Sequence, residues 1–258
     1  MFGGKVLTKK TPQDFEKMVV AGRCVAAVHE AVRATIRPGV TTAQLDLVAA
    51  EVTRKHGCRP SFLGYHGFPA TICTSPNSAI VHGIPGDYTL KDGDLISIDA
   101  GAIYEGWHGD AAFTVAVGEV PKDVQRLLET TEKALWNGLR QARVGRRLGD
   151  VGDAINSTAE PFGYGVVREY VGHGIGRQMH EAPNVPNYGT PGQGLKFKTG
   201  MALAIEPMFN IGGSDTAVMD DEWTVVTADG SLSAHFEHTV LITEDGPIVS
   251  TLPEPLAL

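Results

Sequence analysis

Four acidic side chains stand in segments whose composition otherwise suits buried strands. Asp99 ends the stretch KDGDLISID, Asp110 follows in HGDAAFT, Glu206 ends KTGMALAIE, and Glu237 lies inside SLSAHFEHTVLIT. Burying an unpaired carboxylate is costly, so such a group is normally matched by a cation, shifted in pKa or turned to solvent. For Glu237 taken alone, an edge strand with its carboxylate in water is the simpler interpretation.

The four acids belong to a repeat within the chain. KDGDLISID at residues 91–99 matches KTGMALAIE at residues 198–206. Three more matches follow the same order: IRPG at 36–39 with RVG at 143–145, VHGIP at 81–85 with GHGIG at 172–176, and HGD at 108–110 with HFE at 235–237. Self-similarity in a fixed order implies two copies of one supersecondary unit. We therefore predict a single catalytic domain over residues 1–258, with pseudo-twofold halves at about 11–120 and 121–250.

Each half reads as two helices followed by strands. The apolar periodicity predicts helices over 11–35, 41–56, 121–141 and 147–160, with Thr11 and either Thr41 or Thr42 as N-caps. Strands are predicted over 71–82, 94–103, 108–117, 201–209, 223–228 and 233–243. This order indicates an α+β fold with a curved antiparallel sheet in the middle and helices on its convex side.

The hairpin of the first half would bring its two aspartates together. The midpoint between Asp99 and Asp110 falls between Tyr104 and Glu105, so a turn there would place the aspartates directly opposite each other. Their Cβ atoms would then lie about 5 Å apart, where like charges are destabilising. A positive group is expected between them.

The second half would add Glu206 and Glu237 at the same point. Two divalent cations balance the charge of four carboxylates, which a single proton does not. Two metals bridged by carboxylates about 3.5–4 Å apart form a hydrolytic arrangement. His173 is the candidate imidazole ligand, because its flanking glycines would let the backbone turn sharply and leave the ring accessible.

Composition and charge limit the function classes. The chain has 258 residues, 42% of them apolar, and a net charge of -8, which disfavours broad attraction to nucleic acid. Three cysteines without a CxxC pair favour a reducing compartment, which we interpret as the cytosol. Residues 1–17 contain no apolar signal region, and no later run approaches the roughly 20 apolar residues of a membrane helix.

Seven segments resemble type I methionine aminopeptidases: SFLGYHGFPATICTS, VHGIP, SIDAGA, HGDAAFT, EYVGHGIGRQMHE, AIEPM and HFEHTV. The resemblance runs from about residue 11 to about residue 250. It implies the internally duplicated pita-bread fold. Met179 departs from the Phe of many relatives, and Pro76 interrupts a segment that often reads SIN. We expect no zinc-finger extension of the eukaryotic cytosolic kind, because the chain resembles the short bacterial form.

The resemblance also implies roles for individual residues. Two histidines, His82 and His180, match those that contact the substrate. Asp110 and Glu237 match the two bridging carboxylates. The full set of matching metal ligands is Asp99, Asp110, His173, Glu206 and Glu237, and the methionine pocket is formed by Tyr65, Phe68, Cys73, Tyr170 and Trp223.

The implied reaction removes the N-terminal methionine from nascent proteins and peptides with a small second residue, through a hydroxide that bridges two metals. Glu206 would take the remaining proton and pass it to the leaving amine. His180 would stabilise the oxyanion, and His82 would hold the scissile-bond nitrogen or the adjoining backbone. An oxygen-rich ligand set with one imidazole suits Mn(II), Fe(II) or Co(II), and zinc is a further candidate that lacks its favoured thiolates.

The expected partners are nascent polypeptide N-termini, with transient ribosome association, a monomeric state, a cytoplasmic location, no specific nucleic acid and no membrane. Three other interpretations stay open. A proline-directed aminopeptidase or prolidase shares the fold and ligands, but it resembles this chain only in its C-terminal half and carries an extra N-terminal domain. A non-catalytic protein of the proliferation-associated type would be expected to lack ligands, as would a metal-free amidinohydrolase related to creatinase, and all five ligands stand here.

Overall fold

The computed structural model describes residues 7–258. Residues 1–6, with which the predicted domain begins and which belong to the N-terminal segment predicted to lack a signal region, lie outside the described residues. Its helices are α1 (Pro12–Thr35), α2 (Thr42–Lys55), α3 (Lys122–Gln141) and α4 (Leu148–Ala159), with short 3-10 turns at Tyr65–Gly67 and Glu160–Phe162. Its strands are β1 (Arg59–Pro60), β2 (Ile72–Pro76), β3 (Ala79–Val81), β4 (Leu95–Tyr104), β5 (Trp107–Ala116), β6 (Gly165–Val166), β7 (Gly172–Gly174), β8 (Glu181–Val185), β9 (Ala202–Ile205), β10 (Met208–Asn210), β11 (Thr216–Val218), β12 (Val225–Thr227), β13 (Ser233–His235), β14 (Glu237–Ile242), β15 (Pro247–Val249) and β16 (Leu256–Ala257).

The helices begin and end within a residue of the predicted positions, and local capping explains two of their starts. The Thr11 hydroxyl accepts the Asp14 N–H, and the Asp14 carboxylate accepts the Thr11 N–H, which forms a capping box. Thr41 forms the same box with Gln44, so Thr41 and not Thr42 is the N-cap. Within residues 7–258, no helix combines the length and apolar character needed to cross a membrane.

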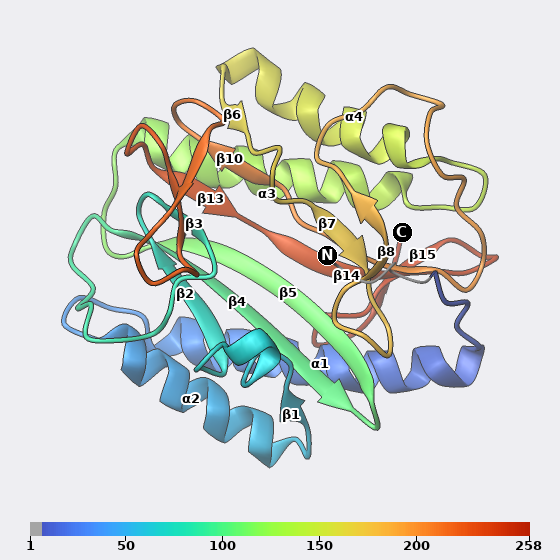
Figure 1. Cartoon of the computed structure of the whole chain (residues 1–258), viewed down its shortest axis with the longest axis horizontal. Coiled ribbons are helices and arrows are strands. Elements are labelled where there is room, and N and C mark those ends of the chain that lie inside the picture. The colour runs from blue at the N-terminus through green and yellow to red at the C-terminus, as the bar shows by residue number, and fades with distance from the viewer. Residues whose placement is uncertain (1–6) are drawn as a thin grey trace.

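Among residues 7–258, the main sheet has ten strands in the order β1-β4-β5-β14-β9-β7-β8, with β2 on β4 and with β15 and β16 attached through β14. All of its strand pairs are antiparallel. In the centre, β5 from the first part of the chain pairs with β14 from the last part, as Figure 1 shows. The predicted mixed fold with an antiparallel sheet is confirmed, and the division into halves at about 120 stays a prediction.

The helices pack on one face of this sheet. Val28 of α1 and Leu135 of α3 share one hydrophobic cluster with Ile98 of β4 and Ile205 of β9. Figure 1 shows the α1–α2 pair beside one end of the sheet and the α3–α4 pair beside the other. Because successive strand side chains point to opposite faces, Asp99, which follows Ile98, lies on the face away from the helices.

The β4–β5 hairpin turns one residue later than predicted. Tyr104 pairs with Trp107, so the turn consists of Glu105 and Gly106, whose φ angles are 47° and 80°. Two successive positive φ angles are the signature of a type I′ turn, which matches the twist of the flanking strands and favours Gly.

This register changes the relationship between the two aspartates. Asp99 pairs with Ala112, and Asp110 pairs with Gly101, so the prediction of directly opposed aspartates is wrong. They occupy diagonal positions on the same face, where Cα separations are typically about 7–8 Å. The wider spacing leaves room between the carboxylates.

Three predicted strands are interrupted in the structure. The stretch 71–82 divides into β2 and β3 at Asn77, whose φ is 56°. The stretch 201–209 breaks after Ile205, where Pro207 follows Glu206 and lacks the N–H that a strand ladder needs. The stretch 233–243 breaks at Phe236. The second and third interruptions lie beside Glu206 and Glu237.

Candidate metal centre and substrate cavity

A cavity of about 1240 Å³ is lined by every residue that the sequence predicts to be functional. These twelve lining residues are His82, Asp99, Asp110, His173, His180, Glu206 and Glu237, together with Tyr65, Phe68, Cys73, Tyr170 and Trp223. They come from segments between Tyr65 and Glu237, so the fold gathers them from most of the chain.

The acids lie on two neighbouring rows of residues, each row being a line of paired residues that runs across the strands of the sheet. In the first row, Ala112 of β5 pairs with Asp99 on one side and with Glu237 on the other. Residues directly opposite each other on paired strands point to the same face. Asp99 and Glu237 therefore share the face that carries the cavity.

The second row holds Asp110 and His173. The Thr239 hydroxyl accepts the Asp110 N–H at 3.0 Å and donates to the Asp110 carbonyl at 2.8 Å, so it bridges β14 to β5. Thr239 pairs with Ala204, and Ala204 pairs with His173 of β7. The backbone ladder thus fixes the spacing between this carboxylate and this imidazole.

The orientation of His173 directs one ring nitrogen at the acids. Nδ1 lies 2.9 Å from the Gly174 carbonyl oxygen, so Nδ1–H donates there and Nε2 carries the lone pair. Nε2 lies 3.8 Å from Oδ2 of Asp110 and 3.6 Å from Oε1 of Glu206. A backbone carbonyl that fixes the tautomer in this way is typical of metal-binding histidines.

The prediction that His173 lies on an accessible turn is wrong. It lies in strand β7 and is only 3% exposed. Its flanking glycines allow strands to approach closely: a Cβ on Gly172 would lie 2.4 Å from the Ala204 carbonyl oxygen, and one on Gly174 would lie 2.1 Å from that of Ala182.

Burial and neighbouring charges shift the pKa values of the four carboxylates in different directions. Burial, reinforced by the charge of Glu206, raises the pKa of Asp99 to about 7. Burial and the neighbouring carboxylates raise the pKa values of Asp110 and Glu237 well above their usual range. Burial also acts to raise the pKa of Glu206. The nearby imidazoles, with His235 first among them, outweigh burial and hold the pKa of this carboxyl below its usual value.

The donor atoms fit divalent cations. Oδ1 of Asp99, Oδ1 of Asp110 and Oε1 of Glu237 are buried and have no hydrogen-bond partner among residues 7–258. Ligand atoms of Asp110, His173 and Glu237 lie within 4.8 Å of one another, as do those of Glu206, His235 and Glu237. Orphaned buried oxygens with raised pKa values are the environment that a cation stabilises.

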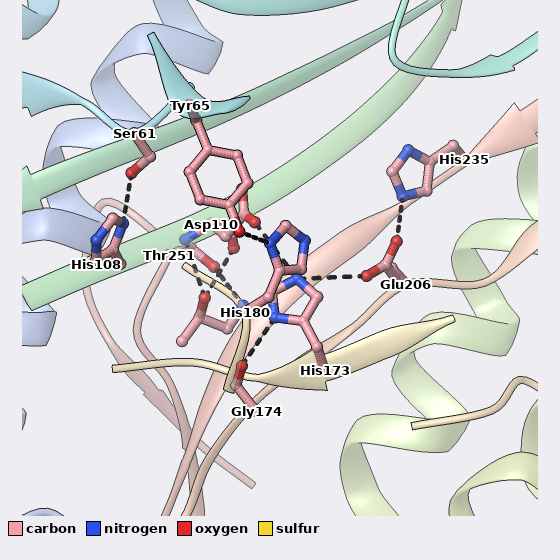
Figure 2. A network of polar contacts seen from close by, with 11 residues as sticks. Ser61, Tyr65, His108, Asp110, His173, Gly174, His180, Glu206, His235 and Thr251 are labelled. Carbon is pink, nitrogen blue, oxygen red and sulfur yellow. Dashed lines mark hydrogen bonds and ion pairs between the residues drawn. The ribbon is translucent and has the colours of Figure 1, made fainter. Parts of the chain in front are cut away.

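His235 belongs to this cluster, although sequence reasoning gave it no role. It is 1% exposed, and its Nε2 lies 3.6 Å from Oε2 of Glu206. Figure 2 shows the Glu206 carboxylate between His173 and His235. The repeat alignment of HGD with HFE pairs His235 with His108, and this was the available signal.

The two predicted substrate histidines lie beside aromatic rings. Nδ1 of His180 is 2.8 Å from the Tyr65 hydroxyl, and the His180 ring centroid is 4.2 Å from that of His173. His82 has a φ of 61°, and its ring meets the ring of Tyr170 edge-on at 5.7 Å. Burial lowers the pKa of His82, so its neutral form is favoured.

An apolar pocket adjoins the acids. Phe62, Phe68, Cys73 and Met179 are buried in one cluster, with Trp223 packed against it. The rings of Phe68 and Trp223 meet edge-on at 5.1 Å. Phe62 lines the same cavity and was not predicted.

Comparison with known proteins identifies the family. Residues 16–244 match the metallopeptidase family M24. Methionine aminopeptidase 1 of Bacillus subtilis (strain 168) is 50% identical over 237 residues, covering 92% of this chain and 96% of that protein. The crystal structure of methionine aminopeptidase from Thermotoga maritima is similar with a TM-score of 0.94 at 44% identity, covering 96% of this chain and 100% of that one.

A more distant structure shares the fold alone. Prolidase from Pyrococcus furiosus has a TM-score of 0.78 at 23% identity, over 95% of this chain and 66% of that chain. With 50% identity to one methionine aminopeptidase and a TM-score of 0.94 to another, the chain has the pita-bread fold and belongs to the methionine aminopeptidases of metallopeptidase family M24.

Proposed function

We propose that this chain is a metal-dependent methionyl aminopeptidase, which removes the N-terminal methionine from nascent proteins and peptides with a small second residue. One observation carries the proposal: the acids and imidazoles of the candidate metal centre line the same cavity as a cluster of buried apolar and aromatic side chains, an environment that suits an aliphatic or thioether side chain.

Two divalent cations would be held by Asp99, Asp110, His173, Glu206 and Glu237. When bound, they would act as Lewis acids and lower the pKa of a water molecule toward neutrality. Carboxylate oxygens dominate this donor set, which favours Mn(II), Fe(II) or Co(II), with zinc as a further candidate.

Glu206 is our candidate for proton transfer. Its pKa lies below its usual value, so the carboxylate is charged at neutral pH and is able to accept a proton. The same oxygen would return that proton to the leaving amine. Glu206 would thereby serve both as ligand and as general base.

His180 and His82 would act on the peptide group. When the Tyr65 hydroxyl donates to Nδ1 of His180, the imidazole proton resides on Nε2, which is the tautomer needed to donate to a developing oxyanion. His82, which lines the same cavity, would contact the scissile-bond nitrogen or the adjoining backbone.

The apolar pocket would select the first residue. The methionine side chain would be surrounded by five residues that line the cavity: Tyr65, Phe68, Cys73, Tyr170 and Trp223. The free, unblocked α-amine of the substrate would approach the metal centre beside this pocket. Only a terminal residue would therefore be removed.

The family also suggests the cellular setting. We propose that the substrates are nascent chains met in the cytoplasm, with transient ribosome contact, and that the enzyme is a monomer. We further propose one catalytic domain built from halves at about 11–120 and 121–250, whose central strands β5 and β14 pair with each other.

A peptide panel tests the activity. The Mn(II)-loaded enzyme is offered Met-Ala-Ser, Met-Phe-Ser, N-acetylated Met-Ala-Ser and an Ala-Pro dipeptide. We expect release of methionine from Met-Ala-Ser alone at an appreciable rate. Preferred cleavage of the Ala-Pro peptide would instead support a prolidase, and cleavage of the acetylated peptide would contradict recognition of the α-amine.

A further inference from the structure

The two carboxylate oxygens of Glu206 face different imidazoles. Oε1 lies 3.6 Å from Nε2 of His173, and Oε2 lies 3.6 Å from Nε2 of His235 (Figure 2). The two sides are not equivalent, because His173 also adjoins Asp110, whereas His235 approaches from strand β13 and lies near Glu237. Oε1 is therefore the oxygen on the His173 and Asp110 side, and Oε2 is the oxygen on the His235 side.

The backbone of His235 is held firmly on both sides. Its N–H donates to the Thr114 hydroxyl at 2.8 Å, and that hydroxyl donates to the His235 carbonyl, also at 2.8 Å. Thr114 is itself 2.8 Å from the Ser97 hydroxyl, and His235 pairs with Met208 in the β10–β13 ladder. The imidazole therefore projects from a fixed position toward Glu206.

The ring nitrogen that faces Glu206 has no other partner. Nε2 of His235 is buried and has no hydrogen-bond partner among residues 7–258, and the side chain is 2% exposed. A buried polar nitrogen is costly unless it is paired, and the Oε2 atom of Glu206 is the acceptor within reach.

We propose that His235 is a positioning residue for Glu206: its Nε2–H donates to Oε2 and thereby keeps Oε1 turned toward His173 and the metal centre. The inference rests on the proposed role of Glu206 as ligand and base. A closure of about 0.5 Å would bring the 3.6 Å separation into hydrogen-bond range, and catalytic contacts commonly tighten when the site is loaded. Hydrogen bonds to ligating carboxylates support metal sites in this way.

Direct metal ligation by His235 is the competing explanation, because its Nε2 lies within 4.8 Å of ligand atoms of both Glu206 and Glu237. The two explanations predict different results when the imidazole is replaced by other side chains. The amide of His235→Gln has an N–H that reaches a similar distance and donates to Oε2, but an amide is a poor substitute for an imidazole ligand. His235→Leu provides neither.

The test compares these variants with wild type and with His29→Leu. His29 is a matched control, since its Nε2 is also buried without a partner, but its ring packs on Phe113 under the opposite face of the sheet. For each protein, we would measure Co(II) affinity and stoichiometry by calorimetry, the visible spectrum of bound Co(II), and kcat and KM for Met-Ala-Ser.

His235→Gln is expected to keep two Co(II) ions, the wild-type spectrum and kcat within about threefold. His235→Leu is expected to keep the stoichiometry while Co(II) affinity and kcat fall about 10- to 100-fold, with KM little changed. His29→Leu should match wild type in all these measurements. If His235→Leu does not fold, His235→Asn replaces it, because its amide is one methylene shorter than that of Gln.

Two results would overturn the inference. If His235→Gln loses one Co(II) ion or changes the spectrum, His235 is a ligand. If His235→Leu binds Co(II) and turns over like wild type, the residue has no role at Glu206. If wild type binds Co(II) but does not release methionine, the proposed activity is contradicted. The Co(II) affinity and the spectra of the variants would still decide whether His235 positions Glu206.

Discussion

The hydroxyl oxygen of Tyr65 lies 2.8 Å from Nδ1 of His180. Their rings are stacked with centroids 5.4 Å apart, so both the hydrogen bond and the packing fix the imidazole plane. Tyr65 comes from a 3-10 turn after β1, and His180 from the loop between β7 and β8. Two loops far apart in sequence thus hold the ring of the proposed oxyanion donor in place.

Tyr65→Phe tests that hydrogen bond while keeping the ring. The lost bond is neutral and worth about 1 kcal/mol, so we expect kcat for Met-Ala-Ser to fall roughly fivefold, with KM nearly unchanged. Steady-state kinetics at saturating Mn(II) provide the measurement. An unchanged kcat would show that Tyr65 does not orient His180.

His180→Ala should have a larger effect that added metal does not reverse. Loss of one oxyanion donor typically costs roughly 3 kcal/mol, so kcat/KM should fall about 100-fold or more while the fold and metal content persist. His173→Ala is the matched variant. As a ligand change, it should weaken metal affinity and regain part of its activity in excess Mn(II) or Co(II). Metal rescue of His180→Ala would mean that the two histidines are wrongly assigned.

The helices were predictable from local sequence alone. Thr11 and Asp14 form a capping box that stands directly in the sequence, and buried apolar residues recur along the helix from Met18 to Val32. Strand ends were less predictable, because Asn77 and Phe236 interrupt strands through backbone geometry that composition does not specify. The turn at Glu105 and Gly106 shows the same limit, since the twist of the hairpin selected it.

The carboxylates of the site were predictable because acids in strand-like segments are unusual and repeat in both parts of the chain. His173 was identified as a candidate ligand, but its strand was not. The sequence GHG is typical of a loop, and its glycines are needed in a strand only because the backbone at Ala204 and Ala182 approaches closely, which is a tertiary contact. His235 was missed for a different reason. Its significance depends on a buried nitrogen facing Glu206, which is a tertiary relationship.

The stabilisation by metal should grow as pH rises. The pKa of Asp99 is raised to about 7, and the pKa values of Asp110 and Glu237 are raised well above their usual range. Below about pH 3, these groups hold protons in both the folded and unfolded states. As pH rises, the unfolded chain releases its protons first, so the metal-free fold loses stability up through the folded pKa values.

Bound cations should offset that loss, because they stabilise the charged carboxylates. We expect the increase in Tm on adding Mn(II) to be larger at about pH 8 than at about pH 6. Buried histidines such as His29 titrate alike in the metal-free and the metal-bound protein. Their contribution to stability therefore cancels when the two Tm values are subtracted. Thermal unfolding with and without Mn(II) measures it, and an increase in Tm that shrinks with pH would contradict the assignment of these acids.

Lys10 and Glu181 should stabilise the fold beside His180. Their charged atoms lie 2.7 Å apart, with side chains 1% and 2% exposed. Lys10→Met would leave the Glu181 carboxylate buried without its cation, and we expect the free energy of unfolding to fall by about 3 kcal/mol. Adding Glu181→Gln should recover part of that loss.

Lys55→Met is the matched control for Lys10→Met. Lys55 pairs with Glu51 at 2.7 Å, but their side chains are 60% and 58% exposed. Breaking an exposed pair should cost less than about 1 kcal/mol. Denaturant unfolding of the three variants gives the comparison, and equal losses for Lys10→Met and Lys55→Met would show that the buried pair is not a stabilising contact.

Metal removal followed by metal return tests the central claim most directly. Wild-type enzyme is chelated exhaustively, its metal content is checked by elemental analysis, and methionine release from Met-Ala-Ser is measured before and after Mn(II) is returned. Three carboxylates that line the cavity have an oxygen without a hydrogen-bond partner among residues 7–258, which predicts that chelated enzyme is inactive and that about two Mn(II) ions per chain restore activity. Full turnover by protein shown to contain no metal would contradict the account.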